Sequence, residues 1–556
     1  MVRALALRPQ NEAPPSPRGA GELRSAIRLA LSALAVLALA ACGEAKLGID
    51  DQNKIIDIGN TAEPLSLDPA KTTGIWENNI NGNMFIGLFT EDASANIIPG
   101  MAERWETSED GLTWTFFVRH ANWSDGVPVT AYDFEFALRR VLDPKSLSEY
   151  AAILYTLKNA EAVNAGKLPV SALGVHAIDE RTLEITLEHP AAYLPGILKH
   201  QISYPVPKHV VERWGNDWIK PAHIVVNGPY TLVKWWSNYL VHLRKNPLFY
   251  DAASVCLREL FFYPTNDSDA AVRRMESGAL AWNTTYSPSK TALLKKSLPG
   301  YLHEAPWMVS DYYSINMTRP MFKDARVRRA LSMAIDRDFI IRIRGGGSAS
   351  YQFVPPHMPG YPQGARVTWA DTPLPERRTE ARRLLEAAGY GPNKPLKFVL
   401  SHRNTRDNPR IAVVAQADWH AIAPWVQVEL RPTEVQIHYA NMRAKNFDVG
   451  DGGWVGDYPD AQTYLYLLET RTKEQNYPGY SNPEYDALMT QSSKENDPAK
   501  RADLLRQAEQ MALNDDPIIP IYLENSNNLI SPRITGFVDN VEDIHRARWM
   551  CIADKK

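Results

Sequence analysis

Apolar positions along the chain repeat with two periods, about 3.6 residues in some segments and 2 in others. The first is typical of helices and the second of strands, so the sequence predicts a protein of mixed α and β structure. Residues 113–119 and 183–188 alternate apolar with polar positions, which is typical of half-buried strands. Between them, Thr130 and Asp133 have the spacing of a capping box and predict a helix that ends near Leu142. Nearer the amino end, the pattern predicts a strand at 54–58 and a helix at 78–88.

The second half of the chain continues this mixture of elements. Residues 230–236 and 243–250 predict a hairpin, and Asn246 and Pro247 close its second strand. From 324 to 336 the apolar residues fall on one helical face, and three arginines fall on the other. Further helices are predicted at 380–388, 411–422 and 500–513, and further strands at 396–401, 426–430, 446–449 and 518–522.

The first 41 residues have the pattern of an export signal. Arg24 and Arg28 precede an apolar run from Leu29 to Leu39, which is too short for a membrane-spanning helix. The following residues, Leu39-Ala-Ala-Cys42-Gly, resemble a bacterial lipobox, in which Cys42 carries a lipid. An ordinary signal with a chance cysteine is the alternative. We therefore expect a periplasmic protein that meets the membrane through a lipid anchor only.

Charge and cysteine content narrow the classes of function. The chain has 61 basic and 64 acidic residues, so it has no overall basic field for nucleic acid. Beyond Cys42, only Cys256 and Cys551 remain, and an even pair in an oxidising compartment can form one disulfide. Two cysteines without a cluster of other ligands do not predict a metal site. We expect neither a metal nor a cofactor.

The stretch Trp454-Val-Gly-Asp457-Tyr-Pro-Asp460 is the strongest candidate for a ligand site. Its glycine, proline and carboxylates predict an exposed turn after the strand at 446–449. An aromatic ring beside a carboxylate suits an amine, because the ring attracts cations and the carboxylate accepts a charge-assisted hydrogen bond. The alternative is a solvated turn in which Asp457 caps its own backbone.

Enzyme motifs in the sequence are incomplete. Residues Ser287-Pro-Ser-Lys290 fit the Ser-x-x-Lys pattern of penicillin-binding enzymes, but their Ser-Asp-Asn and Lys-Thr-Gly elements are missing from the sequence. Residues 345–348 are glycine-rich and lack the lysine of a phosphate-binding loop. We predict a protein that is not an enzyme, and an exported cell-wall peptide hydrolase is the alternative.

Several segments together resemble the peptide-binding proteins of bacterial ABC importers, from Ser66 to the end of the chain. They are Pro99–Trp105, Trp123–Thr130, Asn227–Tyr230, Lys245–Pro247, Asp324–Leu331 and Trp454–Tyr458. The resemblance implies an α/β bilobal fold like that of periplasmic binding proteins, with two mixed-sheet lobes, a hinge and an extra inserted domain.

The family's architecture divides this chain into discontinuous domains. Lobe I would comprise residues 43–85, 208–308 and 525–556, the extra domain 86–207, and lobe II 309–524. The chain would cross between the lobes near Met308 and Asn525, which would form the hinge. Cys256 and Cys551 would then both lie in lobe I, which favours their pairing.

The resemblance also implies a function and a set of site residues. A monomer would hold an extended oligopeptide between the lobes as an added strand and deliver it to an ABC permease with its ATPase subunits. The alternative ligands within the family are dipeptides, murein peptides, opines and metal chelates. Asp457 matches the carboxylate that pairs with the peptide α-ammonium. Trp454, Gly456 and Tyr150 match positions beside the ligand's amino end.

Four positions depart from the family's pattern. Where the family places cations for peptide carboxylates, this chain has Gly345, Asn408 and Asp451, and Glu524 replaces a tyrosine that faces the pocket. A shift of one residue would instead place Arg344 at the first of these positions. Read without a shift, Asp451, Asp457 and Glu524 make the cleft acidic and predict a preference for cationic ligands.

Overall fold

The computed structural model describes residues 48–554, except residues 357, 362–363 and 406. The predicted export signal and Cys42 lie outside the described residues. Within them, the chain forms a mixed α/β structure, as expected. No helix in the described part of the chain is long and apolar enough to cross a membrane.

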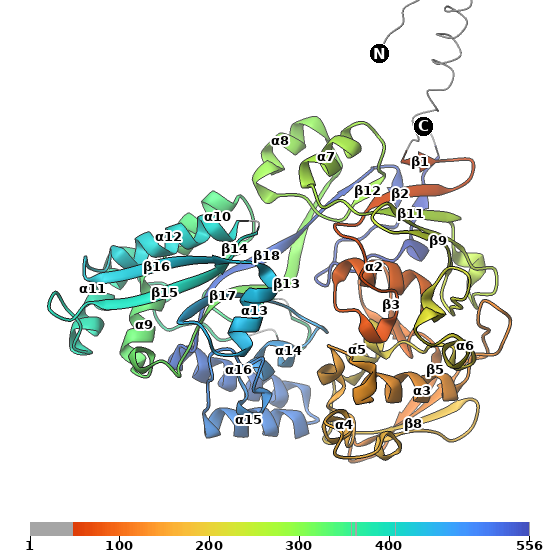
Figure 1. Cartoon of the computed structure of the whole chain (residues 1–556), viewed down its shortest axis with the longest axis horizontal. Helices are drawn as coiled ribbons and strands as arrows, with labels where there is room; N and C mark the ends of the chain where they lie inside the picture. The colour runs from red at the N-terminus through yellow and green to blue at the C-terminus, as the bar shows by residue number, and fades with distance from the viewer. Residues whose placement is uncertain (1–47, 357, 362–363, 406, 555–556) are drawn as a thin grey trace, which may run out of the picture. The chain divides into compact units, whose positions relative to one another are not determined.

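A twelve-stranded sheet is organised around two long antiparallel strands, β13 (Leu302–Ile315) and β18 (Ile518–Ile530). Both strands run between two groups of elements in Figure 1. Beyond β13 lie β17 (Val449–Val455), β15 (Leu396–Arg403) and β16 (Val426–Thr433). Beyond β18 lie β12 (Trp282–Asn283), β2 (Ile55–Gly59), β11 (Glu259–Tyr263), β10 (Leu240–Lys245) and β9 (Tyr230–Trp236), with β1 (Ile49–Asp50) beside β2 and β14 (Ser348–Ala349) beside β18.

The buried apolar side chains form two large, separate cores. One contains Ile58 and Phe262 and extends to Ile552 near the end of the chain. The other contains Ile315 and Leu400, and all of its buried members fall between residues 308 and 522. Two separate cores are what a fold with two lobes requires. The residue boundaries of the lobes stay a prediction.

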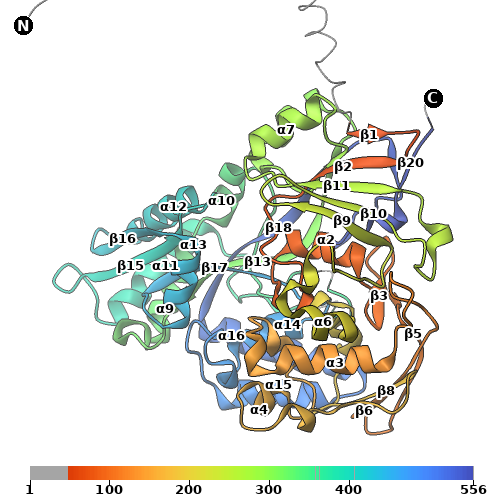
Figure 2. The same cartoon turned by 45° about the vertical axis from the view of Figure 1, so that its right-hand side comes forward.

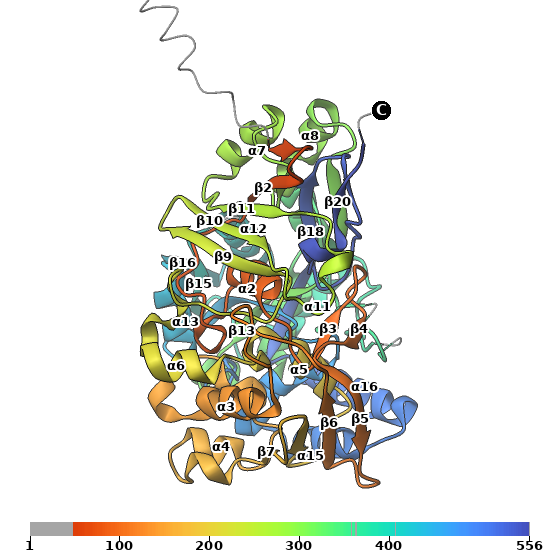
Figure 3. The same cartoon turned by 90° about the vertical axis from the view of Figure 1, so that its right-hand side faces the viewer.

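A second, four-stranded sheet lies in the segment predicted to be an inserted domain. Its strands β5 (Ala102–Thr107), β6 (Thr113–Val118), β8 (Thr182–Thr186) and β7 (Val175–Ala177) pair in that order. They lie near helices α3 (Ala131–Leu142) and α4 (Ala160–Asn164) in Figure 3. The predicted capping box is confirmed, because the Thr130 and Asp133 side chains bond reciprocally to the first turn of α3.

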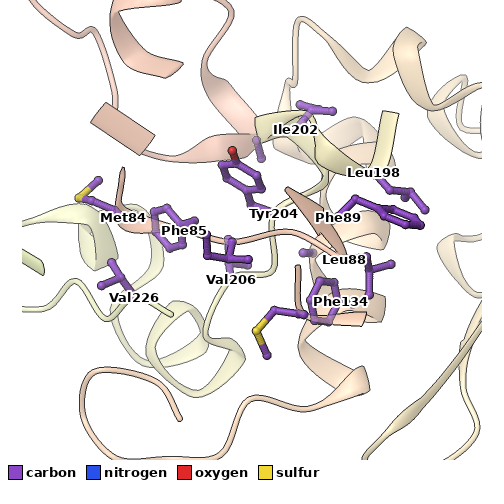
Figure 4. Packing of buried hydrophobic residues seen from close by; sticks show 14 of the residues in the cluster. Met84, Phe85, Leu88, Phe89, Phe134, Leu198, Ile202, Tyr204, Val206 and Val226 are labelled. Carbon is purple, nitrogen blue, oxygen red and sulfur yellow. The ribbon is translucent and has the colours of Figure 1, made fainter. Parts of the chain in front are cut away.

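The helix predicted at 78–88 is shifted in the structure. Helix α2 spans Ile75–Met84, and the chain after it is extended. The Asn227 side chain bonds to both the N–H and the C=O of Ile86, which removes these groups from a helical ladder. Figure 4 shows Phe85, Leu88 and Phe89 of this extended segment packed among buried side chains from other parts of the chain, including Phe134 and Tyr204.

The helices of the second half pack around the strands beyond β13 (Figures 1 and 2). Helix α11 begins at Leu374 instead of residue 380, because Pro375 suits the first turn of a helix. Gly389 follows it with φ +87°, the left-handed conformation that ends helices. The others are α9 (Ala325–Ala334), α10 (Arg337–Arg344), α12 (Asn408–His420), α13 (Val435–Arg443), α14 (Gln462–Leu465), α15 (Pro483–Lys494) and α16 (Pro498–Asp515).

A disulfide joins Cys256 and Cys551, whose Cα atoms lie 5.4 Å apart. Cys256 lies just before β11, and Cys551 begins the short strand β20 (Cys551–Ile552). The bond closes a loop of 295 residues. A covalent link across so long a loop restricts the unfolded chain strongly, and the stabilisation that follows grows with loop length.

We predict that replacing both cysteines, Cys256→Ser with Cys551→Ser, lowers the free energy of unfolding by about 2–5 kcal/mol, the usual cost of losing a native disulfide. Denaturant unfolding of protein purified from an oxidising compartment measures this. Thiol titration of a Cys42→Ser background under denaturing conditions is the control. Two free thiols in that background would contradict the pairing.

Candidate functional site

Strand β17 has one edge that is only partly paired. It pairs with β13 along its whole length, from Val449 opposite Ile315 to Val455 opposite Val309. On its other edge, β15 reaches only as far as Gly450. The next residues of β17, 451–455, therefore have backbone groups on that edge that no strand of the described sheet covers. Such an edge can pair with an extended ligand.

The turn predicted at residues 454–460 begins later than expected. Trp454 and Val455 are the last residues of β17, because β13 offers them a partner strand. Gly456 follows, and its N–H bonds to the Met308 carbonyl at 2.8 Å. A Cβ atom at Gly456 would lie 2.9 Å from the Tyr464 hydroxyl. Glycine is therefore needed here for close packing, and a ligand contact at Gly456 stays a prediction.

Asp457 is a half-buried carboxylate without a cationic partner among the described residues. Tyr150 donates a hydrogen bond to one carboxylate oxygen, and Thr463 donates to the other at 3.4 Å. Burial raises the pKa of Asp457 to about 7, although both hydrogen bonds act in the opposite direction. The prediction that Asp457 lies in an exposed turn is wrong. The site instead holds an anion that a ligand cation would stabilise.

Tyr150 brings the predicted extra domain to this carboxylate. It precedes a short 3-10 turn, Ala151–Leu154, and its ring lies 5.6 Å from the His200 ring. Burial lowers the pKa of His200 to about 3, so the imidazole is neutral and adds no positive charge. Trp454 lies close by, with its indole N–H 3.5 Å from the Thr463 hydroxyl. Tyr150, Trp454 and Asp457 are therefore brought together, as predicted for one site.

The residues after Asp457 pack against the predicted extra domain. The rings of Tyr458 and Tyr193 stack with their centroids 5.3 Å apart and their planes 7° apart. A Cβ atom at Gly196 would lie only 2.7 Å from the Cβ atom of Tyr458. Arg501 pairs with Asp460 at 2.7 Å, which holds the end of this segment. These contacts fix the position of the Asp457 loop.

A cavity of about 600 Å³ reaches Asp457. It lies between residues 152–193 and 457–475, which come from the predicted extra domain and lobe II. Four tyrosines contribute to its wall: Tyr155, Tyr193, Tyr458 and Tyr466. Neither the cavity nor these rings was anticipated from the sequence, because the two segments are distant along the chain and carry no recognisable motif.

Asp451 is buried among cationic and polar partners. Arg403 pairs with it at 3.0 Å, and His438 approaches it at 2.9 Å. Asn408, at the start of α12, donates a hydrogen bond to the same carboxylate. Burial alone would raise the pKa of Asp451, but His438 and Arg403 outweigh it, and the pKa lies below its ordinary value. Asp451 and Asn408 therefore belong to a satisfied polar cluster.

Glu524 also has a partner, because Arg344 pairs with it at 3.0 Å. Gly345 follows helix α10 in the left-handed conformation and ends it. The cation that faces Glu524 is the residue before it, Arg344. Asp451 and Glu524 therefore each have an arginine partner, but the buried Asp311 lies 3.5 Å from Arg403 in the same cluster, and the acidic character of the cleft stays a prediction. Asp457 is the one acid of the three without a cation among the described residues.

The enzyme motif considered above is not assembled. The Lys290 ammonium pairs with Asp269, while the Ser287 hydroxyl bonds to Ser289 at 2.8 Å. Among the described residues, no group of three or more histidines, cysteines or acids could hold a metal ion. A carboxylate that lacks a counter-ion, beside an open strand edge and a cavity, is instead what a binding protein for a cationic group would present.

The fold and this site define the class of protein as a solute-binding protein with two lobes. Residues 96–476 match the family model described as bacterial extracellular solute-binding proteins, family 5 Middle, and the chain belongs to this family. The periplasmic oligopeptide-binding protein OppA of Salmonella typhimurium is 33% identical over 529 residues, which cover 93% of this chain and 96% of OppA.

Two further relatives agree with this assignment. The periplasmic murein peptide-binding protein MppA of Escherichia coli is 35% identical over 497 residues, covering 88% of this chain and 91% of MppA. The crystal structure of Haemophilus influenzae OppA in complex with the peptide RPPGFSPFR matches with a TM-score of 0.80 and 32% identity. That match covers 91% of this chain and 100% of the other.

The contrast between Asp451 and Asp457 gives a testable prediction. Asp451→Ala leaves Arg403 without its main partner, and breaking a buried pair costs about 3–5 kcal/mol of stability. Asp457→Ala removes a carboxylate whose burial is unfavourable but also leaves the Tyr150 hydroxyl without its acceptor, so these two effects oppose each other and the loss of stability is much smaller. Denaturant unfolding of both variants at pH 7 measures this. Equal destabilisation by the two substitutions would contradict the difference in role.

Proposed function

We propose that this protein captures oligopeptides outside the cytoplasm for import and that Asp457 receives the peptide α-ammonium. The observation that carries the proposal is the carboxylate itself, which has two hydrogen-bond donors but no cation among the described residues. An ammonium would supply the missing charge and a third donor. The relatives named for oligopeptides and murein peptides share the family and most of the chain.

The uncovered edge of β17 supports an extended ligand. A peptide whose ammonium meets Asp457 can run beside residues 452–455 and bond to the backbone groups on their uncovered edge, whereas the Asp451 carbonyl already bonds to His438 at 2.7 Å. Such bonds do not depend on the ligand's side chains, so they favour peptides of varied sequence. The two-lobe fold supports closure around the ligand, with the hinge at the register irregularity of β13 between Pro306 and Ser310.

The transport role adds partners to this proposal. Membership of an extracellular solute-binding family supports delivery to an ABC permease and its ATPase subunits. We place the mature protein in the periplasm, held to a membrane by a lipid on Cys42, and acting as a monomer. In this role the protein binds and releases its ligand without a chemical reaction. The alternative is a family member with a specialised ligand, namely a dipeptide, a murein peptide, an opine or a metal chelate.

The first test of this function compares Asp457→Asn with wild type. Isothermal titration should show that trialanine binds the variant about ten- to a hundredfold more weakly, which is the loss expected for one charge-assisted bond of 1.5–3 kcal/mol. N-acetyl-trialanine should bind wild type with a similar loss. Equal affinity for the free and acetylated peptides would overturn the ammonium assignment.

Binding should also depend on pH around neutrality. The pKa of Asp457 is raised to about 7, so its anionic form is lost as pH falls below 7. We expect trialanine affinity to fall by up to about tenfold per pH unit below 7 and to weaken again above about 8, where the peptide amine deprotonates. Titrations from pH 5.5 to 9 measure this. Asp457→Asn should lose the acidic limb and keep the basic one.

A further inference from the structure

The cavity beside Asp457 leads away from the edge of β17 that would hold the peptide backbone. Asp457 lines it, whereas residues 452–455 of β17 do not. A ligand whose ammonium meets Asp457 therefore places only its amino-terminal part within reach of this space. Because the cavity measures about 600 Å³, a long side chain fits into it.

The inner wall of the cavity suits an amphipathic side chain. Tyr193 and Tyr458 are buried and present aromatic rings, against which an aliphatic stem can pack. Thr156 is a buried residue of the same wall and lies beside Tyr193.

The outer wall carries an excess of negative charge. Glu161 and Glu188 are exposed, line the cavity and make no ion pair within the described part of the chain, and one Glu188 oxygen accepts a hydrogen bond from the Asn159 N–H at 2.5 Å. Lys167 is the one lining cation that makes no ion pair there, since Arg471 pairs with Glu469 at 2.7 Å. Burial lowers the pKa of the lining His189, so that ring is neutral.

We propose that this cavity receives the side chain of the ligand's first residue and selects lysine or arginine at that position. The aliphatic stem packs on the tyrosines, and the cationic end lies near Glu161 and Glu188. The inference rests on the proposed function, because Asp457 must hold the ammonium for the first side chain to enter. Because Glu161 and Glu188 both belong to the predicted extra domain, this domain would determine the preference for cationic ligands.

Three tripeptides test the proposal by isothermal titration: Lys-Ala-Ala, norleucine-Ala-Ala and Ala-Lys-Ala. Wild type should bind Lys-Ala-Ala about three- to tenfold more tightly than norleucine-Ala-Ala, since two partly exposed acids each contribute modestly. The double variant Glu161→Gln with Glu188→Gln should reduce this ratio to within about twofold. Ala-Lys-Ala should bind like norleucine-Ala-Ala.

The matched control is Glu109→Gln, which removes an exposed acid of the same predicted domain that does not line the cavity. It should keep the wild-type ratio. The preference in wild type should also shrink between 0.05 and 0.5 M salt, because exposed charges are screened.

Each outcome separates this inference from the proposed function. Equal affinity of wild type for the lysine-first and norleucine-first peptides overturns the inference, while binding of both leaves the proposed function standing. An equal gain for Ala-Lys-Ala also overturns it, because the preference would then not belong to the first position. If none of the three peptides binds, the proposed function fails and this inference fails with it.

Discussion

The pairing of β13 with β18 is the constraint on which the rest of the structure depends. The ladder runs from Leu302 opposite Leu529 to Ser314 opposite Ile518, with irregular register between Pro306 and Ser310. On one side the ladder continues through β12 and β2, whose buried side chains belong to the first core. On the other side it continues through β17 and β15, whose buried side chains belong to the second core. Because β17 builds on β13, this ladder also positions the carboxylate that follows β17.

The surroundings of each acid, more than its position in the motif, decide what it does. Asp451 pairs with Arg403 between strands β17 and β15, and Glu524 of β18 pairs with Arg344 of helix α10, so each pair joins two elements and leaves little charge for a ligand. Asp457 has hydroxyl donors only, so its ionised form is poorly stabilised until a cation arrives. Acidic side chains thus form ion pairs at two of these positions, whereas the third has no cation beside it among the described residues.

Local patterns predicted the elements well where neighbouring residues decide them. The capping box at Thr130 and the strand at 113–119 depend on short-range periodicity and hydrogen bonding, and both are confirmed. The end of α2 was misplaced because the distant Asn227 binds the backbone at Ile86. No sequence pattern reports such a contact between residues that are far apart in the chain.

The site shows the same limit. The motif around Asp457 pointed to the candidate loop, but the arginines that pair with Asp451 and Glu524 lie on other elements, and their pairing depends on the tertiary fold. The 600 Å³ cavity likewise needs two segments that meet only in the folded chain. The sequence could therefore nominate Asp457 as a candidate anchor, whereas the ion pairs around the site and the shape of the cavity required the structure.

The first core has a consequence for the order in which the chain can fold. Its members include Ile58 and, much later in the chain, Ala547 and Ile552. The buried members of the second core all lie between residues 308 and 522, so a ribosome makes them before it makes Ala547 and Ile552. In a chain that folds as it is made, the first core is therefore the later of the two to close.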